Sequence, residues 1–291
     1  MKAASNLVAI IIATFVCGPT LAADVPAGPP RRVSIVRYDD HAMEPFITRD
    51  GRYLLFNNLN PPSTNTDIHF AERKDDFTWT YRGKVNGINT PELEGCPTLD
   101  RAGRIFFVSP RNYPKTLCTI YSGQFKDGNV TDVQMVESIS RKEPGIVNFD
   151  LEISPDGKTL IFVDSRFKPG AGSQTADLVM ALSDGTRFVR SPESARIFKE
   201  VNKTAALPYA PTISGDGLTL YFTRFEPASA FGGPQIYRST RASGQAPFGL
   251  PVHVKGPGDF VEGTALSPDE HLLYFHRKDG NRHNLYAVSL P

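Results

Sequence analysis

Short apolar runs recur along the chain in pairs, each pair joined by a four-residue turn. In the clearest copy, residues 151–153 precede a Ser-Pro-Asp-Gly turn at 154–157, and an apolar run ending in Phe162 follows. Proline suits the second position of such a turn, and glycine supplies the left-handed conformation that closes a hairpin. β-Branched and aromatic residues fill the second run, as is typical of a buried strand. The pattern therefore predicts a β-hairpin over residues 150–162.

This hairpin pattern occurs five times at a nearly constant spacing. The fourth turn position recurs at intervals of 52, 54, 60 and 53 residues, at Gly51, Gly103, Gly157, Gly217 and Glu270. Each second strand ends in a phenylalanine, namely Phe56, Phe107, Phe162, Phe222 or Phe275. A third strand and a weaker fourth strand follow, the fourth being clearest at 133–135 and 251–254. Repeats of this length with four strand patterns are typical of propeller blades.

The two ends of the chain indicate how such a ring closes. The last repeat stops after its third strand, whereas a strand-like run at 32–37 precedes the first repeat. We therefore predict an all-β, five-bladed β-propeller of four-stranded blades over residues 32–291, closed by the N-terminal strand completing the last blade. An open β-solenoid or two separate sandwiches are the alternatives, and repeats of this length fit them less well.

The first 22 residues have the features of a secretory signal peptide. Lys2 precedes an apolar run at 7–16, and the small residues Ala22 and Ala23 suit cleavage after either one. The run is short for a membrane span, so an uncleaved anchor is the weaker reading, as is a lipoprotein signal at Cys17. We expect a linker at 23–31 and a monomer without a stable membrane span after cleavage. Its location would be periplasmic or secreted.

Charge and cysteine content narrow the range of partners and crosslinks. The chain has 32 basic and 31 acidic residues without a basic block, so nucleic acid is not expected as a partner. Cys96 and Cys118 remain in the mature chain, where oxidising conditions permit a disulfide. The repeats place them on strands two apart, about 9–10 Å from each other. Because a disulfide needs Cα atoms within about 7 Å, two free thiols are favoured over a bond.

The repeats resemble the TolB-type propeller repeat, whose hallmark is a Ser-Pro-Asp-Gly turn before an apolar strand ending in Phe. The match is closest at 154–162 and extends to 214–222 and 267–275, while Thr48 and Asp100 open turns that lack Ser-Pro. The resemblance covers nearly all of residues 32–291. It implies the propeller fold and an exported protein that binds an envelope protein or a glycan. The hallmark residues belong to turns and core, so they imply little about function.

One face of the predicted ring collects the candidate binding residues. The starts of the first strands and the loops after the second strands meet at this loop-rich mouth. The strand starts supply Glu44, Glu94, Asp150, Tyr209 and Glu262, and the loops supply Asn58, Arg111, Arg166, Arg224, His276 and Arg277. Arginine forks bind carboxylates and phosphates, and acids accept hydrogen bonds from sugar hydroxyls. Alternatively, these groups pair with one another around a wet funnel.

Three functions fit this mouth, and the first is favoured. It is binding of a protein or glycan without catalysis, since long loops on a rigid scaffold are common binding sites. A carbohydrate-active hydrolase or lyase would use two of the carboxylates Glu44, Asp150 and Glu262. A metal-dependent lactonase would hold Ca²⁺ on those carboxylates and Asn57. No nucleophile elbow or phosphate-binding glycine loop occurs, so no other cofactor is expected.

Overall fold

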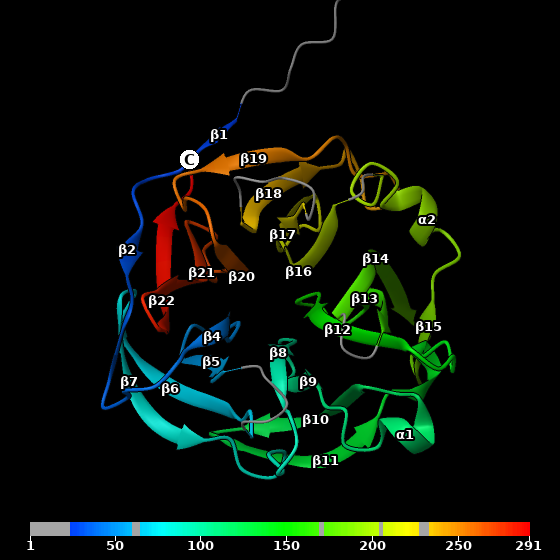
Figure 1. The fold of residues 1–291 in the computed structure, drawn as a ribbon, viewed down its shortest axis with the longest axis horizontal. Helices are drawn as coiled ribbons and strands as arrows, with labels where there is room; N and C mark the ends of the chain where they lie inside the picture. The colour runs from blue at the N-terminus through cyan, green and yellow to red at the C-terminus, as the bar shows by residue number, and fades with distance from the viewer. Residues whose placement is uncertain (1–23, 60–64, 169–171, 204–205, 227–232) are drawn as a thin grey trace, which may run out of the picture.

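Five β-sheets form a ring (Figure 1), and the first strands of the five sheets line a narrow channel at its centre. The computed structural model describes residues 24–59, 65–168, 172–203, 206–226 and 233–291. The predicted all-β fold of five four-stranded blades is confirmed. The predicted signal peptide at 1–22 and the tips of the long mouth loops lie outside the described residues. No described helix is long and apolar enough to cross a membrane.

Each blade consists of four antiparallel strands, which in blades 1 to 4 follow one another along the chain from the channel outwards. Blade 1 contains β4 (Met43–Ile47), β5 (Tyr53–Asn57), β6 (Ile68–Asp75) and β7 (Thr78–Lys84). Blade 2 contains β8 (Gly95–Leu99), β9 (Arg104–Val108), β10 (Ile120–Lys126) and β11 (Asn129–Met135). Blade 3 contains β12 (Ile146–Ile153), β13 (Thr159–Lys168), β14 (Gly172–Ser183) and β15 (Phe188–Arg190).

The two remaining blades follow the same plan. Blade 4 contains β16 (Leu207–Ile213), β17 (Thr219–Phe225), β18 (Gln235–Thr240) and β19 (Val252–Lys255). Blade 5 contains β20 (Val261–Leu266), β21 (Leu272–Asp279), β22 (Arg282–Ser289) and the N-terminal strand β2 (Arg31–Arg32). Short helical turns, α1 (Tyr113–Thr116), η2 (Glu137–Ile139) and α2 (Ser194–Ile197), connect strands of blades 2 to 4.

The N-terminal segment runs along the outer edges of three blades (Figure 1). Arg31 and Arg32 pair antiparallel with β22, so the predicted closure of the last blade is confirmed there. The rest of the expected strand behaves differently, because β3 (Ser34–Val36) pairs in parallel with β7 of blade 1. Upstream, β1 (Val25–Pro26) pairs in parallel with β19 of blade 4. These additions cover strand edges that would otherwise be open to pairing with another chain.

Hydrophobic side chains pack in five clusters, one at each interface between neighbouring blades. Each cluster contains one of the five phenylalanines that recur in the second strands, and all five are fully buried. The interface between blades 5 and 1 closes the ring and holds Val33, Trp79, Tyr274 and Leu285. Burial of each large apolar side chain contributes about 1.5–3 kcal/mol, so this interface closes the ring tightly. Trp79, the single tryptophan, is therefore a probe of ring closure.

Two departures from the Ser-Pro-Asp-Gly turn compensate each other. Glu270 holds a left-handed conformation, φ +61°, where the other four blades have glycine. Its Oε1 accepts a hydrogen bond from the backbone N–H of Gly215, which stands where blades 3 and 5 have proline. A proline there would have no N–H to donate. The strained Glu270 therefore links the turns of blades 4 and 5.

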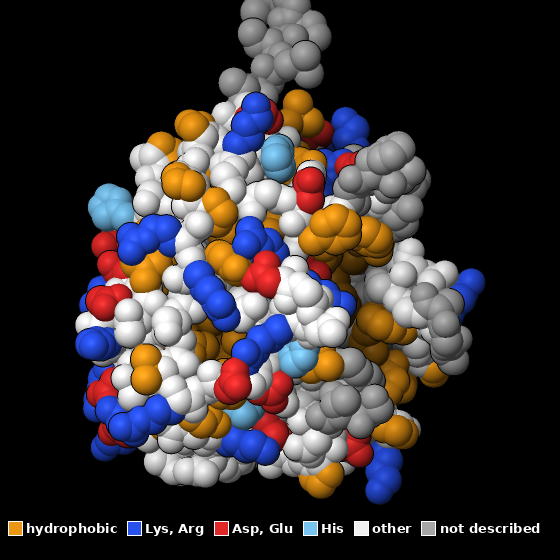
Figure 2. All heavy atoms as spheres, turned by 60° about the vertical axis from the view of Figure 1, so that its left-hand side comes forward, with side chains coloured by type: hydrophobic (Ala, Val, Ile, Leu, Met, Phe, Trp, Pro, Cys, Tyr) orange, Lys and Arg blue, Asp and Glu red, His pale blue; other side chains and the backbone are white. Residues whose placement is uncertain are grey.

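The outer surface mixes charges of both signs. Figure 2 shows the side that carries β2, β22 and β7, where basic and acidic side chains alternate with scattered hydrophobic ones. Arg282 pairs with Asp39 there, and Arg82 pairs with Glu72 at 2.6 Å. Neither sign of charge dominates this side of the molecule.

Candidate functional site

The first strand of every blade is interrupted at the same point by a β-bulge facing the channel. The bulged residue is left-handed in all five, with φ between +47° and +69°, at Glu44, Cys96, Asp150, Ala210 and Gly263. A left-handed conformation costs a non-glycine residue about 1–2 kcal/mol. Four of the five positions bear this cost, and such strain is often found at functional sites.

Neighbouring blades satisfy most of the backbone N–H groups of this bulge ring. In three blades the partner is the polar residue that follows the recurring second-strand phenylalanine of the preceding blade. These pairs are Glu44 N to His276 Nδ1, Cys96 N to Asn57 Oδ1 and Gly263 N to Thr223 Oγ1, at 3.1–3.3 Å. Blade 3 has the apolar Val163 in that slot, so Ala210 N donates instead to Asp150 Oδ2 at 3.1 Å. Asp150 is thereby fixed by the next blade.

The mouth end of the channel brings two acids and a thiol together. Glu44, Cys96 and Asp150 each place a ligand-type atom within 4.8 Å of the others. Cys96 Sγ donates to Asp150 Oδ1 at 3.0 Å. Burial raises the pKa of Asp150 to about 6 despite that hydrogen bond, and burial raises the pKa of Cys96 well above its usual value. Burial at this end of the channel therefore favours the protonated forms of Asp150 and Cys96 more than water does.

Glu262 and His276 border the same end and are held by neighbours. Tyr209 donates its hydroxyl to Glu262 Oε2 at 2.8 Å, and burial raises the pKa of both groups. His276 is 1% exposed, and burial lowers its pKa to about 3, so its ring is neutral. Among the described residues, no ion pair reaches Asp150 or Glu262. The predicted residues Asp150, Tyr209, Glu262 and His276 thus lie near one another. Asp150 and His276 are buried, whereas Tyr209 and Glu262 are partly exposed.

The opposite end of the channel is plugged by a neutralised carboxylate. Glu152 is 2% exposed and pairs with Arg49 at 3.0 Å. Thr98 and Thr212 donate their hydroxyls to the same carboxylate at 2.9 and 3.3 Å. Arg49 also donates to the carbonyl oxygens of Leu99 and Ile153, which tie blades 1, 2 and 3 together. The cavity between the two ends measures only about 20 Å³, too small for a sugar ring.

Two predicted mouth residues form an internal ion pair. Glu94 is fully buried and lies 3.2 Å from Arg111. Thr90 and Ser109 donate further hydrogen bonds to the Glu94 carboxylate at 2.6–2.8 Å. Arg111 also donates to the carbonyl oxygen of Ile88. Because these bonds are made within the protein, both side chains stabilise blade 2 and are not available to bind a ligand.

The other predicted mouth residues are also engaged. Arg224 pairs with Glu226 at 2.7 Å and is mostly buried over the ring of Tyr237. Arg277 pairs with Asp279 at 3.1 Å. Asn58 accepts a hydrogen bond from Asp67 N at 2.7 Å, which closes the connection between β5 and β6. Arg166 is half exposed and meets Glu143 at 3.4 Å. The alternative prediction, that mouth groups pair with one another, describes these residues better than an open polar funnel.

A lateral groove on the loop-rich face, beside blade 3, has far more room. Its cavity volume is about 540 Å³, and β13, β14, β15 and α2 contribute to its walls. Asp164 pairs with Arg190 and lies 3.7 Å from Arg141. Asp177 and Lys199 also line the groove, and among the described residues neither side chain makes a hydrogen bond or an ion pair. Burial, followed by the charge of Asp164, raises the pKa of Asp177.

Sequence reasoning missed this groove and the channel role of Cys96. The groove depends on the connection that contains α2, which is not part of the repeat. Cys96 occupies the same repeat position as Glu44 and Asp150, so the alignment itself was the available clue. Cys96 and Cys118 are free thiols, as favoured from the strand spacing. Cys118 is buried just before β10, near the carbonyl oxygens of Ile120 and Val136.

The predicted calcium ligands only partly converge. Asn57 Oδ1 accepts the hydrogen bond from Cys96 N, and Glu262 is hydrogen-bonded to Tyr209. The atoms that do converge are two carboxylate oxygens and a thiol sulfur. Calcium prefers six to eight oxygen ligands, so this donor set fits it poorly. A calcium ion at this position stays a prediction.

Comparison with known proteins supports the architecture. No family model matches the chain, and no curated protein matches it. A solved glycoside hydrolase aligns over 92% of both chains, with 11% identity and a TM-score of 0.59. A thermostable family-43 glycoside hydrolase aligns over 89% of this chain and 92% of its own, with 12% identity and a TM-score of 0.53.

TolB from Acinetobacter baumannii is also among the similar structures. It aligns with 87% of this chain at 16% identity, with a TM-score of 0.48, and the chain spans about half of it, 54%. The two glycoside hydrolases, at 11% and 12% identity, establish the propeller fold alone, and the alignment with TolB adds no argument. Membership of the TolB-type repeat family therefore stays a prediction.

Proposed function

We propose that this protein is an exported, non-catalytic binding module that takes up a polar ligand, a glycan or a protein segment, on its loop-rich face. The observation that most supports this proposal is the difference in volume between the channel cavity and the lateral groove. The channel that gathers the acids has a volume of about 20 Å³, whereas the lateral groove has about 540 Å³. Of these two, the groove is within the usual size of ligand pockets, roughly 300–1,000 Å³. Export to the periplasm or beyond rests on the N-terminal sequence.

The chemistry of the groove suits a polar, hydrogen-bonding ligand. Asp164 and Arg190 neutralise each other and stiffen one wall. Asp177 and Lys199 contribute one uncommitted acceptor and one uncommitted donor of opposite charge. Sugar hydroxyls and peptide groups both donate and accept hydrogen bonds, so either satisfies the two side chains.

A double variant, Asp177→Asn with Lys199→Gln, tests this proposal. The mature protein would be applied to a glycan array and to immobilised envelope proteins, beside the variant and Arg187→Gln. Arg187 is exposed on the opposite face of the same blade and pairs only with Asp184, so its variant controls for general charge loss. We expect the double variant to lose capture at least about tenfold and the control to retain it. Equal capture by all three proteins, or none by the wild type, would contradict the proposal.

A carbohydrate-active hydrolase is the second candidate, favoured by one observation. Asp150 has a pKa raised to about 6 and lies beside Glu44, as a general acid beside a second carboxylate requires. The similar glycoside hydrolases share its fold, which supports this candidate only by analogy. Against it, no room for a substrate opens at these carboxylates. A lactonase has less support, because one of the three converging ligand atoms is sulfur.

A further inference from the structure

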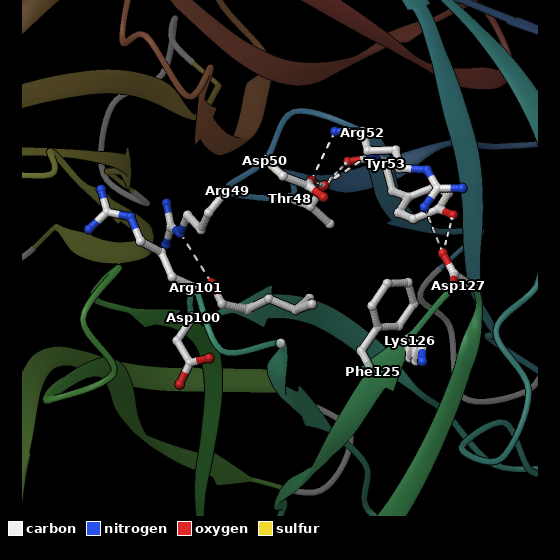
Figure 3. A pocket seen from close by; sticks show the side chains of 12 residues that line it. Thr48, Arg49, Asp50, Arg52, Tyr53, Asp100, Arg101, Phe125, Lys126 and Asp127 are labelled. Carbon is white, nitrogen blue, oxygen red and sulfur yellow. Dashed lines mark hydrogen bonds and ion pairs between the residues drawn. The ribbon is translucent and has the colours of Figure 1, made fainter.

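The face opposite the mouth carries a second pocket, between the hairpin turns of blades 1 and 2. Its volume is about 220 Å³, and residues 48–53, 99–103 and 125–127 contribute to its walls. Figure 3 shows the guanidinium groups of Arg49 and Arg101 at one end and Phe125 with Lys126 at the other. This turn-face pocket is separated from the mouth by the plugged channel.

The pocket lies where the sequence departs from the repeat. Blades 3 and 5 have proline at the second turn position, whereas blades 1 and 2 have Arg49 and Arg101. The turns close in the same way without proline, because Gly51 N still donates to Thr48 O and Gly103 N to Asp100 O. Turn geometry therefore does not require arginine at either position. Arg49 is used to plug the channel, but the described structure shows no such use for the Arg101 side chain.

Internal partners engage the three carboxylates that line the pocket. Asp50 accepts hydrogen bonds from Thr48 Oγ1 and the backbone N–H of Arg52. Asp100 caps its own turn and pairs with Arg104 at 3.2 Å. Each of these acids is thus satisfied within its own hairpin region.

The third acid and the remaining cations complete the charge pattern. Asp127 pairs with Arg52 at 2.8 Å and accepts a hydrogen bond from the hydroxyl of Tyr53. By contrast, Arg101 and Lys126 make no side-chain hydrogen bond or ion pair among the described residues. Four basic residues against three acids line the pocket, an excess of one positive charge. A monoanion complements that excess.

Apolar groups form the floor beneath these charges. Leu99, Tyr53 and Phe125 are buried and line the pocket. The rings of Tyr53 and Phe125 meet edge to face, with centroids 5.9 Å apart, across the interface between the blades. A short apolar body can therefore rest on this floor while its charged group reaches the arginine end. Guanidinium binds carboxylates through two parallel hydrogen bonds, which fixes the orientation of such a ligand.

We propose that the turn-face pocket binds a small organic carboxylate, with Arg101 holding the anionic group and the apolar body lying over Leu99, Tyr53 and Phe125. The ligand is independent of anything bound on the loop-rich face. The pocket is smaller than sites for drug-sized molecules, so it suits a compact monocarboxylate rather than a nucleotide or an oligosaccharide.

Titration of the ¹⁵N-labelled mature protein with phenylacetate, hexanoate and phenylacetamide tests this. We expect saturable shifts for both carboxylates at millimolar concentration, centred on the amides of Tyr53, Arg101 and Phe125. The neutral amide should shift them little. Arg101→Gln should weaken carboxylate binding at least about tenfold. Lys158→Gln, which removes an exposed charge from the turn face of blade 3, is the matched control and should bind as the wild type does.

The outcomes separate the proposal from its alternatives. Denaturation followed by Trp79 fluorescence would confirm that Arg101→Gln leaves the fold intact. Asp177→Asn with Lys199→Gln, on the loop-rich face, should leave carboxylate binding unchanged. Equal binding of phenylacetate and phenylacetamide would show an apolar site without anion recognition. That result would overturn the proposal. So would equal carboxylate binding by Arg101→Gln and the wild type, or the absence of saturable binding of either carboxylate.

Discussion

Asp150 and Glu152 lie two residues apart on β12, face the same channel and have opposite surroundings. Glu152 meets the Arg49 guanidinium and two threonine hydroxyls. Asp150 meets the Cys96 thiol and the Ala210 N–H, near Glu44. The two buried carboxylates therefore differ in their partners: Glu152 has a cation beside it, whereas no ion pair reaches Asp150 among the described residues.

The difference assigns separate roles to the two ends of the channel. The end with Glu152 ties three blades together and makes a plug. The mouth end combines strained bulges with carboxyl groups whose pKa is raised by burial. Because a structural role accounts for the first end and not for the second, variants at each end should fail in different ways.

Removal of the plugging cation should have the largest effect. Arg49→Met would leave the Glu152 carboxylate buried without its counter-charge, which costs about 3–5 kcal/mol in comparable cases. We expect that loss in the free energy of unfolding, measured by urea denaturation with Trp79 fluorescence. Adding Glu152→Gln to Arg49→Met should restore part of the loss. A single variant within about 1 kcal/mol of the wild type would contradict the plug.

At the mouth end, Asp150→Asn should change how stability depends on pH. The pKa of Asp150 is about 6 in the folded protein against 3.8 for the free group. Its contribution to stability is fully present below pH 3.8 and is lost as pH rises through about 6. The loss amounts to roughly 3 kcal/mol at most.

The measurement is the difference between wild type and Asp150→Asn across that pH range. Buried histidines such as His69 and His276 have lowered pKa values, so their contributions change in the opposite direction in both proteins. The difference cancels them. Parallel stability curves for the two proteins between pH 4 and pH 6 would show that Asp150 titrates normally.

A smaller effect should come from the bulge ring itself. Gly263 has φ +69°, and a Cβ there would lie 2.7 Å from both Glu44 Oε2 and His276 Nδ1. We expect Gly263→Ala to lower the free energy of unfolding by about 1–3 kcal/mol. Ala210→Gly, at the matching position of blade 4, should be neutral or slightly stabilising because it relieves a left-handed alanine. Similar losses in both variants would show that the bulges are unstrained.

The sequence predicted the blades well because their determinants are local. Each hairpin turn and the phenylalanine after it lie within about a dozen residues, so the repeat is visible without tertiary information. Ring closure was also predictable from the unpaired last blade. How far the N-terminal segment extends along the ring was not, because its pairing with β7 and β19 depends on edges that only the folded ring presents.

The position of the candidate site was predictable from the sequence, but the backbone conformation and side-chain pairing of its residues were not. The repeat alignment correctly placed Glu44, Asp150 and Glu262 around one end of the channel. It could not show the bulges, since proline after Glu44 and Ala210 favours an extended residue before it. Nor could it show that Glu94 turns inward to Arg111, because that pair depends on side-chain packing within blade 2.

A direct assay of hydrolysis would decide between binding and catalysis. The wild type and Asp150→Asn would be incubated with aryl glycosides of pentoses and hexoses near pH 6, and aryl release would be followed. Since the channel has no room for a sugar ring, we predict no turnover above the protein-free rate for either protein. Turnover by the wild type that Asp150→Asn abolishes would contradict a non-catalytic role for this propeller.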